Sequence, residues 1–197
     1  AASPSKYART KAEGEAAVRE IYPDAVVIRH SIVFGAGDSF FNRFAAMAQT
    51  SPVLPLIGGG ATLFQPVFVG DVALAIDRAV ALPEAAGQTY ELGGAGALSF
   101  KALMELMLTE INKRRLLLPL PWPAASLVGG LGDLAGMVIT PPITSDQVTL
   151  LKTDNVVSGA CPGLAELGIT PATLEAVLPT YLYRYRKGGQ YADQEDR

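Results

Sequence analysis

A short apolar run behind a helix-like segment constrains the fold of this chain more than any other feature. The run covers residues 25–29, Ala-Val-Val-Ile-Arg, and follows residues 22–24, whose Tyr-Pro-Asp combines a helix stop with a turn. β-Branched apolar runs of this length are typical of strands buried in a parallel sheet. Gly35 and Gly37 then allow a sharp exit loop at the carboxyl edge, where open α/β sheets bind ligands. This order of helix, buried strand and glycine loop predicts a doubly wound α/β fold.

A tyrosine and a lysine lie four residues apart on the helix-like segment before that strand. Residues i and i+4 share one face of a helix, so the Lys11 ammonium can hold positive charge beside the Tyr7 phenol. A nearby cation favours the phenolate and so lowers the pKa of a phenol. The phenol can then serve more readily as an acid and a base near neutral pH. Taken alone, the spacing favours an exposed first-turn tyrosine with a solvated lysine one turn on. Whether the pair is interpreted as a proton-transfer site therefore depends on the neighbouring sequence.

In these segments the chain resembles the extended short-chain dehydrogenase/reductase family. In that family a Tyr-x-x-x-Lys pair lies on the helix before the sixth strand of the sheet, and an Arg-x-x-x-x-Phe/Tyr-Gly pattern follows it. Arg29, Phe34 and Gly35 match the second pattern. The resemblance implies the C-terminal part of a Rossmann-type, doubly wound parallel sheet with a smaller, mostly helical C-terminal lobe. It also implies binding of NAD or NADP by the complete protein.

The same resemblance implies roles for individual residues around the nicotinamide. Tyr7 would act as the general acid/base, while Lys11 would favour its phenolate and hold the cofactor ribose. His30, where many relatives have proline, is expected at the cofactor edge together with Ser31 and the backbone of Val33. For His30, a packed or solvent-linked imidazole is favoured over a catalytic one.

A narrower resemblance links the chain to the branch that contains the nucleotide-binding accessory subunit of respiratory complex I and its bacterial relatives. It is carried by residues 40–44, 52–60, 144–148 and 154–157. This resemblance implies a tightly bound dinucleotide, an accessory or assembly role, and membrane-complex subunits as partners. The alternative is an active NAD(P)-dependent epimerase or reductase that uses the Tyr-Lys pair on a carbonyl or sugar-nucleotide substrate. A weaker third hypothesis is a stable scaffold without a small-molecule role.

Two further segments repeat the order of strand and helix. Residues 64–73 run from a strand into a helix, and Asp71 is expected as the N-cap of that helix. Residues 88–94 are expected to form a strand, and the amphipathic run 99–112 a helix with Ser99 as its cap.

The glycine-rich phosphate turn of the family does not precede Tyr7 in this sequence. The nearest pattern, at residues 130–135, follows a proline-rich passage instead of a strand and is interpreted as an apolar helix. We therefore expect the C-terminal part of a longer protein, which alone binds dinucleotide weakly. The expected division is 1–92 for the remainder of the Rossmann-like domain, 93–187 for the smaller lobe and 188–197 for a flexible tail.

The composition argues against several classes of function. A formal charge of -3 and a pI near 5.2 disfavour nucleic-acid binding, and the basic cluster 113–115 fits the C-terminal end of the preceding helix. Cys161 and His30 are the only residues of their types, so neither a disulfide framework nor a Cys/His metal site can form. Residues 116–132 carry no charge, but their three prolines exclude a transmembrane helix.

Residues 122–137 have two interpretations of equal weight. They form either an apolar surface for a partner within a membrane-bound complex, or a cap over a substrate cleft. With the complex I resemblance, the sequence predicts a cytoplasmic protein, with a peripheral position at the inner membrane as the more specific prediction.

Overall fold

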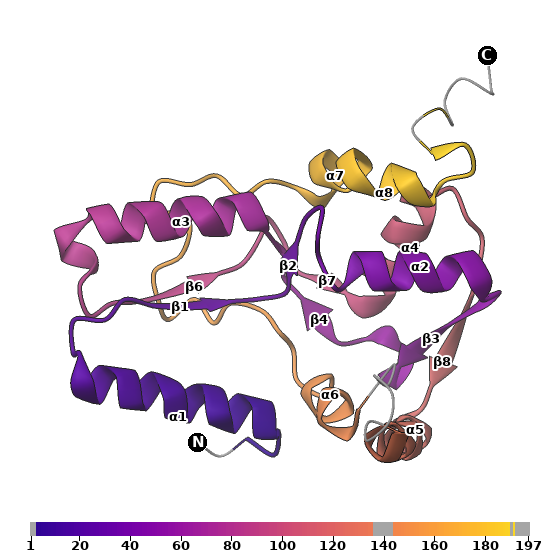
Figure 1. The fold of residues 1–197 in the computed structure, drawn as a ribbon, viewed down its shortest axis with the longest axis horizontal. Coiled ribbons are helices and arrows are strands. Elements are labelled where there is room, and N and C mark those ends of the chain that lie inside the picture. Colours follow the sequence, from indigo (N-terminus) through magenta and orange to yellow (C-terminus); the bar gives the residue numbers. More distant parts are fainter. Residues whose placement is uncertain (1–2, 136–143, 190, 192–197) are drawn as a thin grey trace.

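The computed structural model describes residues 3–135, 144–189 and 191 (Figure 1). Its helices and strands follow the chain in the order α1 (Lys6–Ile21), β1 (Val27–His30), β2 (Val33–Phe34), α2 (Phe41–Thr50), β3 (Val53–Ile57), β4 (Leu63–Phe64), β5 (Val67–Phe68), α3 (Val69–Ala81), β6 (Thr89–Leu92), β7 (Leu98–Ser99), α4 (Phe100–Glu110), β8 (Leu116–Leu120), α5 (Trp122–Ala135), α6 (Ser145–Leu150), α7 (Leu174–Val177) and α8 (Pro179–Leu182). Short 3₁₀ helices lie at Gly58–Gly60, Pro83–Ala85 and Tyr183–Tyr185.

The strands of the described chain pair two by two, and most of the pairs are parallel. β1 pairs with β6, β2 with β5 and β3 with β8 in parallel, while β4 and β7 are antiparallel. In the register of the β1–β6 pair, Ile28 lies opposite Tyr90. Parallel strands need long crossover connections, and the chain between β1 and β6 contains α2 and α3. The expected α/β fold with parallel strands is confirmed.

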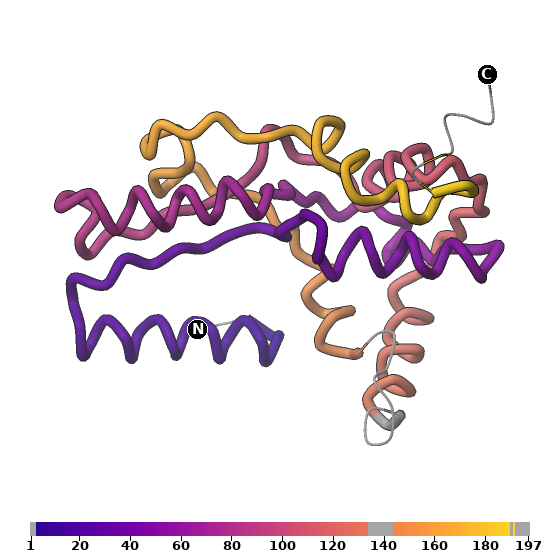
Figure 2. The backbone as a smooth tube through the Cα atoms, turned by 45° about the horizontal axis from the view of Figure 1, so that its top comes forward, coloured from indigo at the N-terminus to yellow at the C-terminus, as the bar shows by residue number. Residues whose placement is uncertain are grey.

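Helices cover the β1–β6 pair from opposite sides. α1 lies along one face of the pair and α3 along the other (Figure 1). The second view shows the same arrangement, with α5 extending away from the rest of the molecule beside α6 (Figure 2). α2, α4 and the β3–β8 pair form the other end, where the short helices α7 and α8 pack into the same core.

α1 begins at a serine cap and ends where the sequence predicts. Ser5 is its N-cap, and the Ser5 hydroxyl accepts a hydrogen bond from the Ala8 N–H at 3.3 Å. The helix ends at Ile21, because the ring of Pro23 disfavours helical geometry at Tyr22. None of the residues in α1 is buried, so packing against the core does not determine where this helix lies.

Two large apolar clusters hold the fold together. One joins α2, β3, α4 and α8, and it buries large side chains such as Phe41, Met104 and Leu182. The other lies among α3, β5 and β6, where small side chains such as Ala75 and Ala79 allow the helix to approach the strands. Full burial of a large apolar side chain is worth about 1.5–3 kcal/mol, so the first cluster dominates the stability of the fold.

Gly35 and Asp38 shape the exit loop that the sequence predicts after the apolar run; β1, which forms there, has no buried residue, contrary to the expected buried strand. Gly35 has a φ of 153°, and a Cβ at this position would lie 2.7 Å from Cγ1 of Val69. The Asp38 carboxylate accepts hydrogen bonds from the Gly35 N–H at 3.3 Å and from the Tyr181 hydroxyl at 2.6 Å. Burial, together with the adjacent Asp38 carboxylate, raises the pKa of Tyr181 far above its ordinary value. The phenol therefore stays protonated and keeps donating to the loop.

Asp71 differs from its sequence-based expectation. α3 begins at Val69 with Phe68 as its N-cap, so Asp71 lies inside the first turn and is not the cap. Its carboxylate instead accepts a hydrogen bond from the Ala172 N–H at 2.8 Å, which ties α3 to the C-terminal segment. Ser99, by contrast, is the N-cap of α4 as expected.

The predicted boundary between residues 92 and 93 stays a prediction. β3, from the first predicted segment, pairs with β8 from the second, and α2 packs on α4 across the same boundary. Residues 136–137 of the predicted apolar surface, and 190 and 192–197 of the predicted tail, lie outside the described residues.

Candidate functional site

The start of α1 presents the predicted Tyr-Lys pair. The Lys11 Nζ atom lies 5.6 Å from the centroid of the Tyr7 ring, so the ammonium faces the π surface of the ring. Tyr7 is 55% exposed. Among the described residues, neither the Tyr7 hydroxyl nor the Lys11 ammonium has a hydrogen-bonding partner. The helix therefore brings the two groups together and leaves both available to a ligand.

Asp146, on α6, holds the base of this helix. Its carboxylate accepts hydrogen bonds from the N–H groups of Lys6 at 2.7 Å and Tyr7 at 3.2 Å, and from the Ser5 hydroxyl at 3.1 Å. These N–H groups have no partner inside the helix, and the carboxylate also complements the positive end of the helix dipole. Although desolvation opposes the shift, the Lys6 and Tyr7 N–H groups lower the pKa of Asp146. A residue 139 positions away in sequence thus fixes the backbone of Tyr7.

Ser31 lies in a buried polar network at the end of β1. It is 6% exposed, its hydroxyl donates to the Asn155 carbonyl at 2.8 Å, and it accepts from the Gln65 N–H at 3.2 Å. The Gln65 side chain continues the network by donating to the Gly94 carbonyl at 2.9 Å and accepting from the Val157 N–H at 3.2 Å. Ser31 therefore fastens the 155–157 segment across the strand ends, and its predicted contact with a cofactor stays a prediction.

His30 and Val33 occupy different surroundings on either side of Ser31. His30 is exposed at the end of β1, and its Nδ1 lies 2.7 Å from the Ser31 carbonyl oxygen, to which it donates. Val33 lies in β2, pairs with Val67 of β5 and packs against the apolar cluster among α3, β5 and β6. No hydrogen bond or ion pair joins His30 to Tyr7 or Lys11 among the described residues, and the cofactor roles of His30 and Val33 remain predictions.

A cavity of about 500 Å³ opens beside Tyr7. We call it the α1–α6 cavity, and its lining consists of Ser3, Pro4, Ser5, Tyr7, Ala8, Ile32, Phe40, Phe44, Ile57, Phe64, Phe100, Gln147, Thr149, Leu150, Leu151, Thr153, Asp154 and Asn155. The first turn of α1, the loop after β2, α2 and the segment from α6 to residue 155 therefore meet around it. This volume lies within the range of small-molecule sites, about 300–1,000 Å³.

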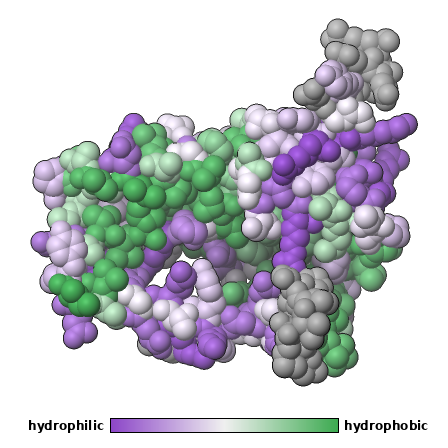
Figure 3. All heavy atoms as spheres, in the orientation of Figure 1, coloured by the Kyte–Doolittle hydropathy of each residue, from purple (hydrophilic) through white to green (hydrophobic). Residues whose placement is uncertain are grey.

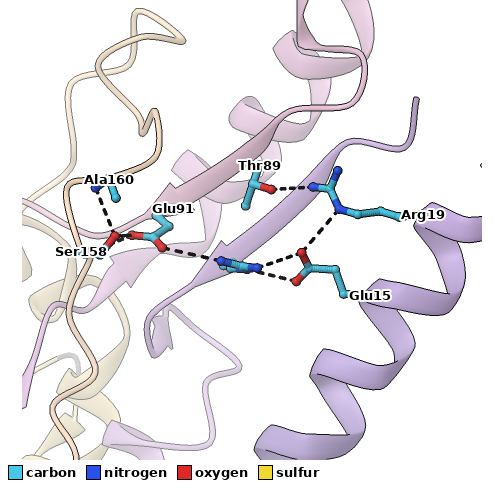
Figure 4. A network of polar contacts seen from close by, with 7 residues as sticks. Glu15, Arg19, Thr89, Glu91, Ser158 and Ala160 are labelled. Carbon is cyan, nitrogen blue, oxygen red and sulfur yellow. Dashed lines mark hydrogen bonds and ion pairs between the residues drawn. The ribbon is translucent and has the colours of Figure 1, made fainter. Parts of the chain in front are cut away.

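A line of charged groups attaches the middle of α1 to the sheet. The Arg29 guanidinium donates to both carboxylate oxygens of Glu15, at 2.8 and 3.0 Å, and lies 4.0 Å from the Glu91 carboxylate. Figure 4 shows Glu15 directed from its helix toward the strands, and Ser158 holding Glu91 on the other side. The hydrogen bond from Arg29 lowers the pKa of Glu15, and the Ser158 hydroxyl and N–H lower that of Glu91. Arg29 of the family-like pattern therefore positions the Tyr-Lys helix.

Sequence reasoning missed Asp146 and Ser158 as partners of the site. A local signal existed for the first of these residues, because Thr144 and Gln147 form a capping box that marks the start of α6. Nothing local predicts which helix α6 meets, since that contact joins segments distant in the chain. Within the described ranges, no group of three or more His, Cys, Asp or Glu residues could hold a metal ion.

Comparison with known families agrees with this geometry. A family model described as the RmlD substrate binding domain matches residues 2–126, and the chain belongs to that family. The chain is also 35% identical over 194 residues to the mitochondrial NADH dehydrogenase [ubiquinone] 1 alpha subcomplex subunit 9 of Arabidopsis thaliana, which covers 95% of this chain and 48% of the relative. The subunit of the same name from Rattus norvegicus is 35% identical over 185 residues, or 93% of this chain and 48% of the relative. The predicted resemblance to the complex I accessory branch is confirmed, and the chain spans about half the length of these relatives.

Solved structures confirm the Rossmann-type fold. The dTDP-glucose 4,6-dehydratase of Streptomyces venezuelae, with NAD and TYD bound, superposes with a TM-score of 0.60 at 18% identity and covers 96% of this chain and 52% of that one. The UDP-glucose 4-epimerase of Thermotoga maritima, with UDP-glucose, gives a TM-score of 0.59 at 19% identity over 93% of this chain and 52% of that one. At these identities the likeness concerns the fold alone.

Proposed function

We propose that this chain is part of a NAD(P)-binding accessory or assembly-type subunit of a respiratory NADH dehydrogenase. The observation that carries the proposal is the 35% identity to the subunit 9 protein of Arabidopsis thaliana, which extends over 95% of the chain. A match over 95% of the chain takes in α6 with Asp146 and most of α1, so the similarity reaches both elements of the candidate site. The neighbours of known structure supply the fold to which a dinucleotide would bind.

The residues at the start of α1 fit one end of such a dinucleotide. A ribose offers hydroxyl groups, and the Lys11 ammonium and Tyr7 hydroxyl are exposed donors on one helix face without partners among the described residues. His30 adds an exposed imidazole at the end of β1. Ser31 acts differently, because its hydroxyl already forms hydrogen bonds with the Asn155 carbonyl and the Gln65 N–H. It therefore positions the end of β1 and does not donate to the ribose through this hydroxyl. Either NAD or NADP meets these requirements.

Each of these residues has a role that does not require turnover. When bound, the nicotinamide ring supplies hydride chemistry. Lys11 places a positive charge beside the Tyr7 ring, Tyr7 holds a proton at its hydroxyl oxygen, and Asp146 fixes the backbone from which Tyr7 projects. In an accessory subunit the same contacts anchor a nucleotide that does not exchange.

The face of α5 supports a peripheral position on a membrane-bound complex. Leu127 and Leu131 are 68% and 60% exposed, although both are large apolar residues. No helix among the described residues is long and apolar enough to cross a membrane. We assign this face to contact with a neighbouring subunit, and we propose that the protein is cytoplasmic and lies peripherally at an inner membrane, or in the equivalent position in mitochondria.

The second candidate function, an NAD(P)-dependent epimerase or reductase, is favoured by the Tyr7–Lys11 geometry itself. A Tyr7→Phe variant of the full-length protein separates the two, with Tyr22→Phe as a matched control because Tyr22 is 62% exposed near the opposite end of α1. Native mass spectrometry measures the nucleotide that co-purifies, and absorbance of the reduced nicotinamide measures its consumption with added carbonyl compounds.

We expect a retained nucleotide without turnover, and assembly of the Tyr7→Phe variant as in the unchanged protein. Consumption of the nucleotide with a carbonyl compound that disappears in Tyr7→Phe and persists in Tyr22→Phe would establish the enzyme instead. A full-length protein that neither retains nor exchanges nucleotide would overturn both functions and leave the scaffold hypothesis.

A further inference from the structure

We infer that the α1–α6 cavity binds an apolar chain that ends in a carbonyl group, and not a phosphate-bearing sugar nucleotide. This inference rests on the proposed function, in that the cavity would lie beside the nicotinamide end of the bound dinucleotide. It adds the chemical class of a second ligand at the same site. Three features of the cavity carry it: its walls, its charge and the position of its polar groups.

Aromatic rings form the inner wall of the cavity. The ring centroid of Phe40 lies 5.4 Å from that of Phe44 and 6.0 Å from that of Phe100, and Phe44 and Phe100 are 5.4 Å apart, all in edge-to-face arrangements. Phe100 is only 2% exposed, and Phe64, 6.3 Å from it, is 6% exposed. The rings pack against one another from several elements, so the wall is rigid and apolar. An alkyl chain gains free energy on such a surface by leaving water.

The charge of the lining is unsuited to a diphosphate. Phosphate groups in proteins are held by Arg, Lys or free N–H groups at a helix start. The described lining of the cavity contains neither Lys nor Arg, and its single charged residue is the acidic Asp154. The start of α1 borders the cavity, but the Asp146 carboxylate already accepts from the Lys6 and Tyr7 N–H groups. An anion at this helix start would therefore meet a carboxylate.

The Tyr7 hydroxyl is a donor of the lining that stays available to a ligand, as are the side-chain N–H groups of Gln147 and Asn155 among the described residues. The Thr149 hydroxyl donates to the Ser145 carbonyl at 2.9 Å, and the Gln147 side chain accepts from the Thr144 N–H at 3.2 Å in the capping box. The Tyr7 hydroxyl has no such partner among the described residues and can donate to a carbonyl oxygen. A ligand with one carbonyl and an apolar body satisfies this arrangement without leaving a buried charge.

Nuclear Overhauser contacts between methyl groups of the protein and a bound ketone test the inference. The probe is undecan-2-one, added to the full-length protein with labelled isoleucine methyl groups, and UDP-glucose is the competing probe. Ile32 and Ile57 line the cavity, whereas Ile21 and Ile76 are 86% and 48% exposed elsewhere. These four methyl groups therefore distinguish entry into the cavity from adsorption to exposed apolar surface.

A matched pair of variants on α1 adds a quantitative readout. Ala8 lines the cavity and Ala12, one turn further on, does not, so Ala8→Phe fills the cavity while Ala12→Phe adds the same side chain outside it. Because α1 has no buried residues, both variants are expected to fold, which circular dichroism checks.

The inference predicts contacts from undecan-2-one to Ile32 and Ile57, binding weakened at least tenfold in Ala8→Phe, and binding unchanged in Ala12→Phe. Contacts to Ile21 or Ile76 alone, absence of binding, or displacement of the ketone by UDP-glucose at equal or lower concentration would overturn it. Nucleotide retention, measured separately by native mass spectrometry, tells which proposal fails. A protein that keeps its nucleotide but rejects the ketone contradicts only the class of this ligand.

Discussion

The two ends of the molecule hold their helices by different forces. At one end, α4 buries five of its residues among aromatic and aliphatic side chains. At the other, α1 has no buried residue and is attached by polar contacts at Asp146, at the Glu15–Arg29 pair and through Arg19, which donates to the Thr89 hydroxyl at 2.5 Å. The helix that carries Tyr7 and Lys11 is thus the one whose position depends on hydrogen bonds and charges.

The surface reflects the same difference. Apolar side chains gather over α3 and the β1–β6 pair in the view of Figure 3, while α1 below them is mostly hydrophilic. Val80 on α3 is 82% exposed. Such exposure is expected of an apolar residue that another surface would cover. The aromatic core buries its large side chains, whereas α1 has no buried residue and α3 leaves apolar side chains exposed among the described residues. Substitutions should therefore act globally at the first end and locally at the second.

The largest expected effect comes from opening the aromatic core. Phe100→Ala removes a ring that is 2% exposed and in contact with Phe40, Phe44 and Phe64, and it should lower the free energy of unfolding by about 3–5 kcal/mol. Val80→Ala on α3 is the control and should change it by less than about 0.5 kcal/mol. Denaturant unfolding measures both. A similar loss for the two variants would mean that the exposed end is packed as tightly as the core.

A smaller effect is expected from removing the serine N-caps at the two ends, and the change at Ser5 also removes its hydrogen bond to Asp146. Ser5 and Ser99 each cap a helix, accepting from the N–H of Ala8 and Ala102 at 3.3 and 3.1 Å. Loss of such a cap costs about 1 kcal/mol. In Ser5→Ala, hydrogen exchange of the α1 amides should accelerate about fivefold, because nothing else buries the helix. In Ser99→Ala, α4 should change less, since its buried face holds it. Equal acceleration in both helices would remove the distinction between the two ends.

The smallest expected effect is a loosening of α1 in acid. The pKa values of Glu15, Glu91 and Asp146 all lie below their ordinary values, 4.5 for the two glutamates and 3.8 for the aspartate. A carboxyl with a lowered pKa in the folded state stabilises the fold above its ordinary pKa, and that stabilisation is lost as the pH falls through the lowered value. Acidification below 4.5 should therefore speed exchange of the α1 amides, after correction for intrinsic rates, while α4 changes little.

Glu15→Gln isolates the share of one carboxylate in this response. It removes the ion pair with Arg29 and should flatten the pH dependence of α1 exchange. The matched control is Glu105→Gln, because Glu105 is an exposed carboxylate on α4 that pairs only with Lys101 among the described residues. Surface pairs contribute little to stability, so the global change should stay below about 1 kcal/mol. A pH response that survives in Glu15→Gln would assign the loosening to Asp146 or Glu91.

Local chemistry allowed much of the fold and part of the site to be predicted. The Pro23 stop and the Ser99 cap act within a few residues, and both are found where expected. The strand expected at residues 25–29 forms at Val27–His30, but none of its residues is buried. The Tyr7–Lys11 pair is local as well, since one helical turn brings its members together. Asp71 shows the limit of this reasoning, because the helix starts two residues earlier and leaves the carboxylate to the Ala172 N–H.

Spacing and side-chain type are enough to predict a helix with tyrosine and lysine on one face, followed by a strand and a glycine exit loop. The burial of that strand was not predictable in this way, since no residue of β1 is buried among the described residues. The surroundings of the Tyr-Lys pair depend on tertiary packing. Asp146 reaches Tyr7 across 139 residues, and the cavity brings Ala8 together with Phe100 and Asn155. Such contacts depend on how separate elements pack, and packing is fixed by the summed burial of many side chains, which no single segment encodes.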